Sequence, residues 1–211
     1  YVVRIPQWDH AGMADVGAVT WGNGAGGITG AISELNSLVG SSAGDLVGEA
    51  GFYGPAGVVE LANGDYVVTS PHWSSATAVG AVTWADGTSG ITGAVSEANS
   101  LVNTSAGDDF YVSTITLLPD GKAALHFPDW VYGSSDGAVS LIGGGSCNPL
   151  GPVSAFNSVL GSAMLGGTQM VLDYDPLNVQ LIVGRPLDNK VTILRCLPGS
   201  VSRVYLPLLT R

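Results

Sequence analysis

Short apolar runs separated by Gly, Asn, Asp and Pro fill the chain, and each run has the length of a β-strand rather than a helix. In the clearest stretch, Asn63-Gly64 and Asp86-Gly87 are dipeptides that favour tight hairpin turns. Pro71 is expected to end the hydrogen-bonded ladder of its strand, because proline has no amide hydrogen. We therefore predict a unit of four antiparallel strands at 57–62, 66–70, 80–84 and 91–96.

The same pattern recurs along the chain. Pro6-Gln7-Trp8, Pro71-His72-Trp73 and Pro128-Asp129-Trp130 lie 71 − 6 = 65 and 128 − 71 = 57 residues apart, and a weaker copy begins at Pro186. A second landmark occupies 17–21, 80–84, 137–141 and 189–193, and an Asn-Ser-apolar-apolar landmark begins at 36, 99 and 157. Such periods indicate units that bury their apolar faces against their neighbours. We predict one repeat domain of four units, approximately 1–56, 57–112, 113–167 and 168–211, with the first unit incomplete.

The later units predict further strands. Turns are expected at Pro119-Asp120-Gly121 and Asp175-Pro176. The expected strands are 114–118, 123–127, 137–142 and 153–156 in the third unit and 169–173, 179–183, 191–194 and 204–208 in the fourth. Helix signals are confined to two short Ser/Asn-rich segments. The prediction is an all-β fold, a β-propeller-like array of about four four-stranded antiparallel blades. A parallel β-helix is the competing fold, but its coils are shorter than these units.

Two families share this order of motifs. The succession LVGSSAGDLVG, VVELANGDYVVTSP and GAVTW resembles the FG-GAP blade of integrin-α-type propellers. The fuller wording NGDYVVTSPHW…GAVTWADGTSGITGAVSEANSLV is still more similar to tandem repeats of bacterial surface and filamentous-haemagglutinin-like adhesins. The resemblance implies propeller blades and a role at a cell surface. Some FG-GAP hairpins bind calcium, but 63–65 and 120–122 hold fewer carboxylates than those loops.

Composition narrows the classes of partner. Seven basic and seventeen acidic residues give a net charge of −10, which removes the positive surface that nucleic acid or an anionic membrane requires. Only 11% of residues are charged, a composition commoner outside the cell than in the cytosol. No apolar run reaches the roughly 18 residues of a membrane span. We expect an extracellular or cell-surface protein that binds no nucleic acid and has no membrane span.

The two cysteines lie in adjacent units. Cys147 and Cys196 each follow the strand that matches the Gly-Ala-Val-Thr landmark of their own unit. In an exported protein one disulfide would tie the last two units together. The alternative is two unpaired thiols, since bonding geometry is not readable from sequence.

Motifs with catalytic associations have simpler interpretations. The segment 22–27 satisfies G-x-G-x-x-G, but its second copy begins with Ala85 and neither copy leads into a helix, so we interpret both as turns. The segments 40–44 and 133–137 satisfy G-x-S-x-G without the parallel α/β sheet that a nucleophile elbow needs. His10, His72 and His126 share no repeat position and are expected to pack at or between blade edges. We predict no catalytic residues, no cofactor and no enzymatic activity.

One cluster carries hard oxygen donors. Asp173, Asp175 and Asn178 flank the last predicted hairpin and form a candidate Ca²⁺ site. The cluster lacks the glycine and the bidentate acid of an EF-hand loop. In the alternative interpretation these residues are simply turn formers.

The tryptophans also have two interpretations. Trp8, Trp73 and Trp130 follow equivalent prolines, whereas Trp21 and Trp84 close equivalent strands. Residues that recur at one position of successive units most simply fill the space between the units. Exposed equivalents would instead suit sugar stacking. The predicted function is therefore non-catalytic adhesion or structure in an extracellular assembly, and the alternative is a carbohydrate-binding, lectin-like module with a surface glycan as partner.

The first unit raises a question about strand pairing. The segment 1–5 matches 66–70, but the first unit has no counterpart of 57–62 to pair with it. A hydrophobic open strand is a template for another strand. The candidates are the C-terminal segment 203–209, a missing upstream segment, or a neighbouring subunit. The prediction favours a homo-oligomer or a fibre built by strand pairing.

Overall fold

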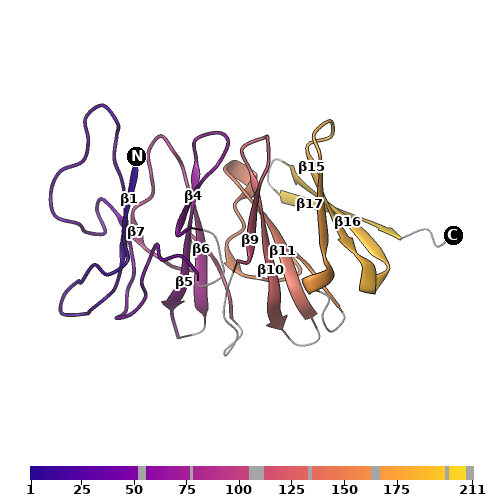
Figure 1. Cartoon of the computed structure of the whole chain (residues 1–211), viewed down its shortest axis with the longest axis horizontal. Helices are drawn as coiled ribbons and strands as arrows, with labels where there is room; N and C mark the ends of the chain where they lie inside the picture. Colours follow the sequence, from indigo (N-terminus) through magenta and orange to yellow (C-terminus); the bar gives the residue numbers. More distant parts are fainter. Residues whose placement is uncertain are drawn as a thin grey trace.

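The computed structural model describes residues 1–51, 56–76, 78–104, 112–132, 135–162, 167–197 and 200–207. Within these ranges the chain forms four β-sheets and three 3₁₀-helical turns, so the all-β prediction is confirmed. The sheets stand side by side in an open row that follows the order of the units, with the sheet of β1 at one end and the sheet of β17 at the other (Figure 1).

Sheet 1 holds β1 (Val2–Ile5), β2 (Ala18–Trp21), β3 (Leu38–Val39) and β7 (Gly93–Ala94), in that order. Sheet 2 holds, in spatial order, β12 (Gly151–Pro152), β8 (Leu101–Val102), β6 (Val79–Ala85), β5 (Tyr66–Ser74) and β4 (Val58–Glu60). Sheet 3 holds β13 (Ser158–Leu160), β11 (Ser135–Ile142), β10 (Ala123–Tyr132) and β9 (Thr114–Leu117). Sheet 4 holds β14 (Val171–Asp175), β15 (Gln180–Arg185), β16 (Lys190–Leu197) and β17 (Ser200–Pro207). The 3₁₀ turns are η1 (Gly145–Cys147), η2 (Gly167–Gln169) and η3 (Pro186–Asp188).

The predicted hairpins are confirmed. β4 and β5 pair antiparallel around Asn63-Gly64, and β9 and β10 pair antiparallel around Asp120-Gly121. Gly64 and Gly121 have φ of +88° and +80°, a left-handed conformation that glycine adopts without steric cost. The Asn/Asp-Gly dipeptides were therefore reliable indicators of hairpin tips.

Two strands continue past a proline that lies just beyond the predicted strand, and Pro71 was expected to end its ladder. β5 passes Pro71, and its pairing with β6 shifts register between Ser70 and Ser74. β10 passes Pro128 in the same way, with a shift between Phe127 and Val131. The prediction was wrong because each proline lies in the irregular segment, where its missing amide hydrogen costs no ladder bond.

The fourth strands of units two and three were placed too early in the sequence. Segments 91–96 and 153–156 were expected to be these strands, but β8 and β13 pair with β6 and β11 instead. Both true strands belong to the Asn-Ser-apolar-apolar landmark. The Ser of this landmark forms a buried hydroxyl pair with the third strand of its unit. These pairs are Thr20–Ser37 at 2.6 Å, Thr83–Ser100 at 2.7 Å and Ser140–Ser158 at 2.6 Å.

Not all the strands are antiparallel, contrary to the prediction. β7 of unit two pairs parallel with β3 of unit one, and β12 of unit three pairs parallel with β8 of unit two. We call each of these two-residue segments, Gly93–Ala94 and Gly151–Pro152, a strap. A strap arises because the residues before each fourth strand run back along the outer edge of the preceding sheet. The units therefore share strands as well as side-chain packing.

The core lies between consecutive sheets. Side chains alternate along β5, so Tyr66 and Val68 pack toward sheet 1 while Val67 packs toward sheet 3. A third cluster, which includes Leu141 and Leu181, joins sheets 3 and 4. Each sheet between two others is thus apolar on both faces, as expected for stacked units.

The C-terminal segment does not close the first unit. β17 pairs with β16 over Ser200–Pro207, at the opposite end of the row from β1 (Figure 1). For residues 203–207 the closure option was therefore wrong, and residues 208 and 209 lie outside the described residues. Among the described strands β1 pairs only with β2, which leaves its other edge open.

Candidate interaction surface

Three hairpin tips lie along one side of the row, at the upper edge of Figure 1. They come from the equivalent pairs β4–β5, β9–β10 and β14–β15. We call the surface formed by residues 63–65, 120–122 and 175–178 the hairpin face. It is rich in Asp and Asn, and two inter-sheet pockets open beside it.

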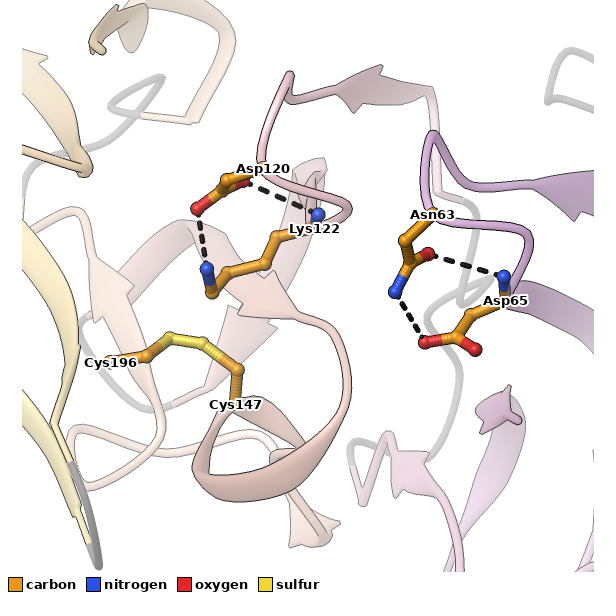
Figure 2. A network of polar contacts seen from close by, with 6 residues as sticks. All are labelled: Asn63, Asp65, Asp120, Lys122, Cys147 and Cys196. Atoms are coloured by element: carbon orange, nitrogen blue, oxygen red, sulfur yellow. Dashed lines mark hydrogen bonds and ion pairs between the residues drawn. A yellow bond between two sulfur atoms is a disulfide. The ribbon is translucent and has the colours of Figure 1, made fainter. Parts of the chain in front are cut away.

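The first tip uses its own polar groups. Asn63 Nδ2 donates to Asp65 Oδ2 at 2.7 Å, and the amide of Asp65 donates to Asn63 Oδ1 at 3.1 Å (Figure 2). The other carboxylate oxygen, Asp65 Oδ1, accepts from the amide of Gly87 at 3.0 Å. Both oxygens of Asp65 are therefore engaged: Oδ2 bonds within the hairpin, and Oδ1 ties the hairpin to the neighbouring turn of the same sheet.

The second tip carries an ion pair. Lys122 Nζ contacts Asp120 Oδ2, and the amide of Lys122 donates to Asp120 Oδ1 at 3.4 Å (Figure 2). Gly121 lies so close to the first tip that an added Cβ would stand 2.6 Å from Cβ of Asn63. The two hairpins are thus packed together, and the carboxylate of Asp120 is paired locally.

The third tip contains the predicted calcium ligands. Asp175 Oδ2 accepts from Asn178 Nδ2 at 2.6 Å and from Gln180 Nε2 at 2.9 Å, while Asp175 Oδ1 accepts from the amide of Asn178 at 3.2 Å. The side-chain bond from Asn178 is the main reason that the pKa of Asp175 is lowered. Asp173 Oδ1 accepts from the amide of Tyr174 at 2.8 Å. These bonds are those of a turn, the alternative interpretation of the cluster.

Among the described residues, no group of three or more His, Cys, Asp or Glu lies close enough together to hold a metal ion. Calcium binding at 173–178 stays a prediction.

An aromatic pocket of about 290 Å³ lies between sheets 1 and 2. Tyr1, Trp21 and Tyr66 line it together with the exposed side chain of Glu60. Trp21 Nε1 donates to the carbonyl of Gly87 at 3.0 Å, which holds the indole against sheet 2. Burial raises the pKa of Tyr66 to about 12. Aromatic faces next to one carboxylate are features that a sugar-binding site uses.

An apolar pocket of about 380 Å³ lies between sheets 3 and 4. Leu117, Leu172 and Tyr174 line it, with prolines from the second and third hairpin tips. Burial, followed by a hydrogen bond to Asp120, raises the pKa of Tyr174 to about 12. Sequence reasoning missed this pocket, because its residues are ordinary strand residues and only the packing of β9 beside β14 brings them together.

The tryptophans divide into two groups. Trp73 and Trp130 are only 2% and 3% exposed, which confirms the core interpretation for both and leaves neither a face for a sugar. Trp130 Nε1 donates to Asn103 Oδ1 at 3.0 Å. Trp8 is half-buried and stacks on His10, with ring centroids 4.9 Å apart. Trp84 is also half-buried and packs against the core between sheets 2 and 3.

The histidines do not converge on one site. His72 Nε2 lies 3.4 Å from Glu49 Oε2, between sheets 2 and 1. His126 Nε2 lies 2.8 Å from the carbonyl oxygen of Gly167, which joins sheet 3 to η2. The His72 contact agrees with the predicted packing between units, whereas the His126 contact lies within unit three.

The glycine motif at 22–27 is a turn, as predicted. Asn23 Oδ1 accepts from the amide of Ala25 at 2.8 Å, and the amide of Gly27 donates to the carbonyl of Asn23 at 2.7 Å. The second copy is built in the same way, with the amide of Gly90 donating to the carbonyl of Asp86 at 2.7 Å.

The segment 40–44 surrounds a buried carboxylate that the sequence did not single out. Asp45 Oδ2 accepts from the amides of Ser41 and Ser42 at 2.7 and 2.8 Å. Asp45 Oδ1 accepts from the amide of Ser74 at 3.2 Å, so this side chain ties unit one to β5. The related motif at 133–137 lies partly outside the described residues. The signal available in the sequence was the Ser-Ala-Gly-Asp string, which recurs at 105–108.

A disulfide joins Cys147 and Cys196 in the structure, with Cα atoms 5.4 Å apart (Figure 2). It connects η1, which follows β11, with β16. Sheets 3 and 4 are therefore linked covalently across their interface. This link complements the apolar cluster to which both cysteines contribute.

None of the helical segments among the described residues is long and apolar enough to cross a membrane.

Comparison with known proteins identified one similarity. Residues 1–49 and 60–111 each match the family model of a repeat of unknown function, DUF5650. The first match contains β1, β2 and β3, and the second contains β5, β6 and β8 together with the strap β7. No curated protein and no solved structure matched the chain. Over its first two units the chain is thus similar to this repeat, and each copy of the repeat corresponds to most of one sheet.

Proposed function

We propose that this chain is a non-catalytic, extracellular repeat protein that acts in cell-surface adhesion as a structural segment. The observation that carries the proposal is the strand sharing between units. The straps bond unit one to unit two and unit two to unit three, and the Cys147–Cys196 disulfide joins sheet 3 to sheet 4, so all four sheets are coupled along the row. Such an array suits a load-bearing or surface-presenting role.

The polar groups of the described sites support a structural role. Asp45, Asp65 and Asp175 each use both carboxylate oxygens in local hydrogen bonds. Groups held in this way orient turns and connect units. A catalytic acid or base instead needs a free position facing a substrate.

The disulfide supports the extracellular assignment. Disulfides persist in oxidising compartments and are rare in the cytosol. The Cys147–Cys196 link and the low content of charged residues are both typical of exported proteins.

The resemblance to FG-GAP blades gives the finer fold within this proposal. Each complete unit has four strands that begin with a hairpin, as a propeller blade does. We propose that the sheets are blades of this type in an open array.

The open edge of β1 supports self-association. Tyr1 and Val3 are 57% and 45% exposed, and β1 has one described strand neighbour. Open hydrophobic strand edges pair readily with other strands. We propose that copies of the chain form homo-oligomers or fibres through this edge.

A bead assay tests the adhesive function. Beads coated with the chain through a C-terminal tag are perfused over surfaces carrying the same chain or host cells, in calcium and in EDTA. We expect retention well above that of bare beads, and reduced retention for Val3→Lys, which places a charge beside the open edge. Val3→Lys must match the parent in melting temperature. Retention no greater than that of bare beads would contradict the adhesive function.

The aromatic pocket favours one second candidate, a carbohydrate-binding module. A glycan array probed with the chain should then give specific signals that Tyr1→Ala abolishes and Val3→Ala leaves unchanged. Tyr1 is the most exposed aromatic residue of the pocket, so its removal disturbs the core least. An array without specific signals would eliminate this candidate.

A further inference from the structure

The inference begins with the geometry of the straps. The amides of Gly93 and Val95 donate to the carbonyls of Ser37 and Val39 at 3.0 and 2.9 Å. The second strap repeats this: the amides of Gly151 and Val153 donate to the carbonyls of Ser100 and Val102, both at 2.9 Å. The residue between the two donors makes no ladder bond to the neighbouring strand, which explains why Pro152 is accepted there.

Unit one contains the same strap, built but not paired. Gly30 has φ of +102°, close to the +100° of Gly93. Asn36 Nδ2 donates to the carbonyl of Ala31 at 2.9 Å, as Asn99 Nδ2 does to that of Ala94 at 2.9 Å. Gly30 and Ala31 are exposed, and the described strands include none that pairs with them.

The side chains around this strap repeat those of an existing interface. Tyr66, Val68 and Val95 pack against sheet 1 and are 3%, 0% and 3% exposed. Trp73 and Ile91 belong to the same cluster. By repeat position, their counterparts in unit one are Tyr1, Val3, Ile32, Trp8 and Ile28. We call these five side chains the N-terminal face.

The N-terminal face is exposed where its counterpart is covered. Tyr1, Val3 and Ile28 are 57%, 45% and 38% exposed, and Trp8 and Ile32 are half-buried. All five are apolar or aromatic, as are the five residues that sheet 2 buries against sheet 1. An exposed hydrophobic patch of this size, beside two backbone amides that can donate to an added strand, has the features of a docking surface.

We propose that the N-terminal face binds a further repeat unit of the same type, whose Asn-Ser-Leu-Val strand pairs in parallel with Gly30–Ala31. The interface between sheets 1 and 2 is the template: the carbonyls of the added strand accept from the amides of Gly30 and Ile32. Among the described strands of the Asn-Ser-apolar-apolar landmark, β3 and β8 already carry straps, whereas β13 is an edge strand of sheet 3. The partner unit is therefore one with an uncovered outer strand. This inference does not depend on the proposed adhesive role.

A tandem chain tests the proposal. Residues 1–65 are placed directly before Tyr1 of the full chain, so that the junction reproduces the native step from Asp65 to Tyr66. Hydrogen exchange is then measured at Gly30 and Ile32 of the original copy, in the tandem and in the parent chain. We expect both amides to exchange rapidly in the parent, and about 100-fold or more slowly in the tandem. Gly93 and Val95 are the internal standards, because they make the same bonds in both chains.

The matched variant is Ile32→Asp in the original copy of the tandem. It places a charge in the new interface, and should remove the protection of Gly30 while that of Gly93 remains. Rapid exchange at Gly30 and Ile32 in a tandem with protected Gly93 overturns the proposal. So does a tandem in which Gly93 loses its protection, because a unit that fits this face leaves the rest of the chain intact. A parent chain that dimerises in light scattering and protects Trp8 shows instead that the face is self-complementary, and also overturns it.

Discussion

At the scale of single residues, the same polar pair recurs wherever a fourth strand joins a unit. Thr83 and Ser100 are both essentially inaccessible, and Ser100 Oγ also donates to Asn99 Oδ1 at 2.9 Å. A buried hydroxyl without a partner is costly, whereas a paired one is nearly neutral. The pair therefore specifies which segment can occupy the fourth position, since segment 91–96 presents no serine at the matching place.

Removing both members of the pair should cost less stability than the sum of the costs of removing each member alone. We expect Ser100→Ala to lower the free energy of unfolding by about 1–3 kcal/mol, because the hydroxyl of Thr83 is left buried and unpaired. The Thr83→Val/Ser100→Ala double variant should lose less than the sum of the two single losses. Urea unfolding of the four proteins gives this coupling energy. Thr29→Ala, at an exposed position, is the control, and strictly additive losses would contradict the expectation.

Tyr66 makes stability depend on alkaline pH. Its pKa is about 12 in the folded chain against an ordinary value near 10, so the folded state holds the phenolic proton more tightly. The contribution is complete below about pH 9 and is lost as pH rises from about 10 to 12. When the pH is raised from 8 to 11, the free energy of unfolding should fall by about 1 kcal/mol less in Tyr66→Phe than in the parent chain. Urea midpoints at the two pH values measure this, and equal losses in the two proteins would show that Tyr66 does not hold its proton.

At the scale of elements, the hairpin tips and turns could be predicted from the sequence, but the pairing of the short strands could not. Asn63-Gly64 and Asp120-Gly121 identify hairpins because their chemistry is local. The fourth strands were misplaced because both candidate segments are short and apolar, and only the hydroxyl pair across the sheet distinguishes them. The straps were not predicted from the sequence for a similar reason. A Gly-Ala dipeptide forms a strand only when the strand of another unit lies beside it.

Equivalent glycines in two units should respond differently to the same substitution. An added Cβ at Gly87 would stand 1.9 Å from the carbonyl oxygen of Gly64, whereas at Gly24, its counterpart in unit one, no atom lies within 4 Å. Gly87→Ala should therefore destabilise the chain by about 1–3 kcal/mol, and Gly24→Ala should change stability little. Thermal unfolding of the two variants provides the comparison. Similar losses of stability in the two variants would mean that the β4–β5 hairpin does not pack tightly against this turn.

At the scale of the whole molecule, stability is a sum of neighbouring interfaces rather than of one core. The Cys147–Cys196 bond closes a separation of 49 residues across one of these interfaces. Its role was left open by the sequence, since spacing alone does not determine whether two thiols meet.

Loss of the disulfide should affect one end of the row more than the other. In the Cys147→Ala/Cys196→Ala variant we expect sheet 4 to lose about 2–4 kcal/mol of stability. Hydrogen exchange at Leu194 should accelerate, while exchange at Val19 in sheet 1 stays the same. Uniform acceleration at both residues would indicate that the four sheets unfold as a single cooperative body.

The straps also set the order in which the sheets can be completed as the chain emerges. β3 begins at residue 38 and receives its strap at residue 93, so 93 − 38 = 55 residues must follow before sheet 1 has its full set of strands. A chain made or exported from its N-terminus therefore completes sheets 1 and 2 only after most of the next unit has emerged. The maturation of these two sheets therefore lags one unit behind the growing end of the chain.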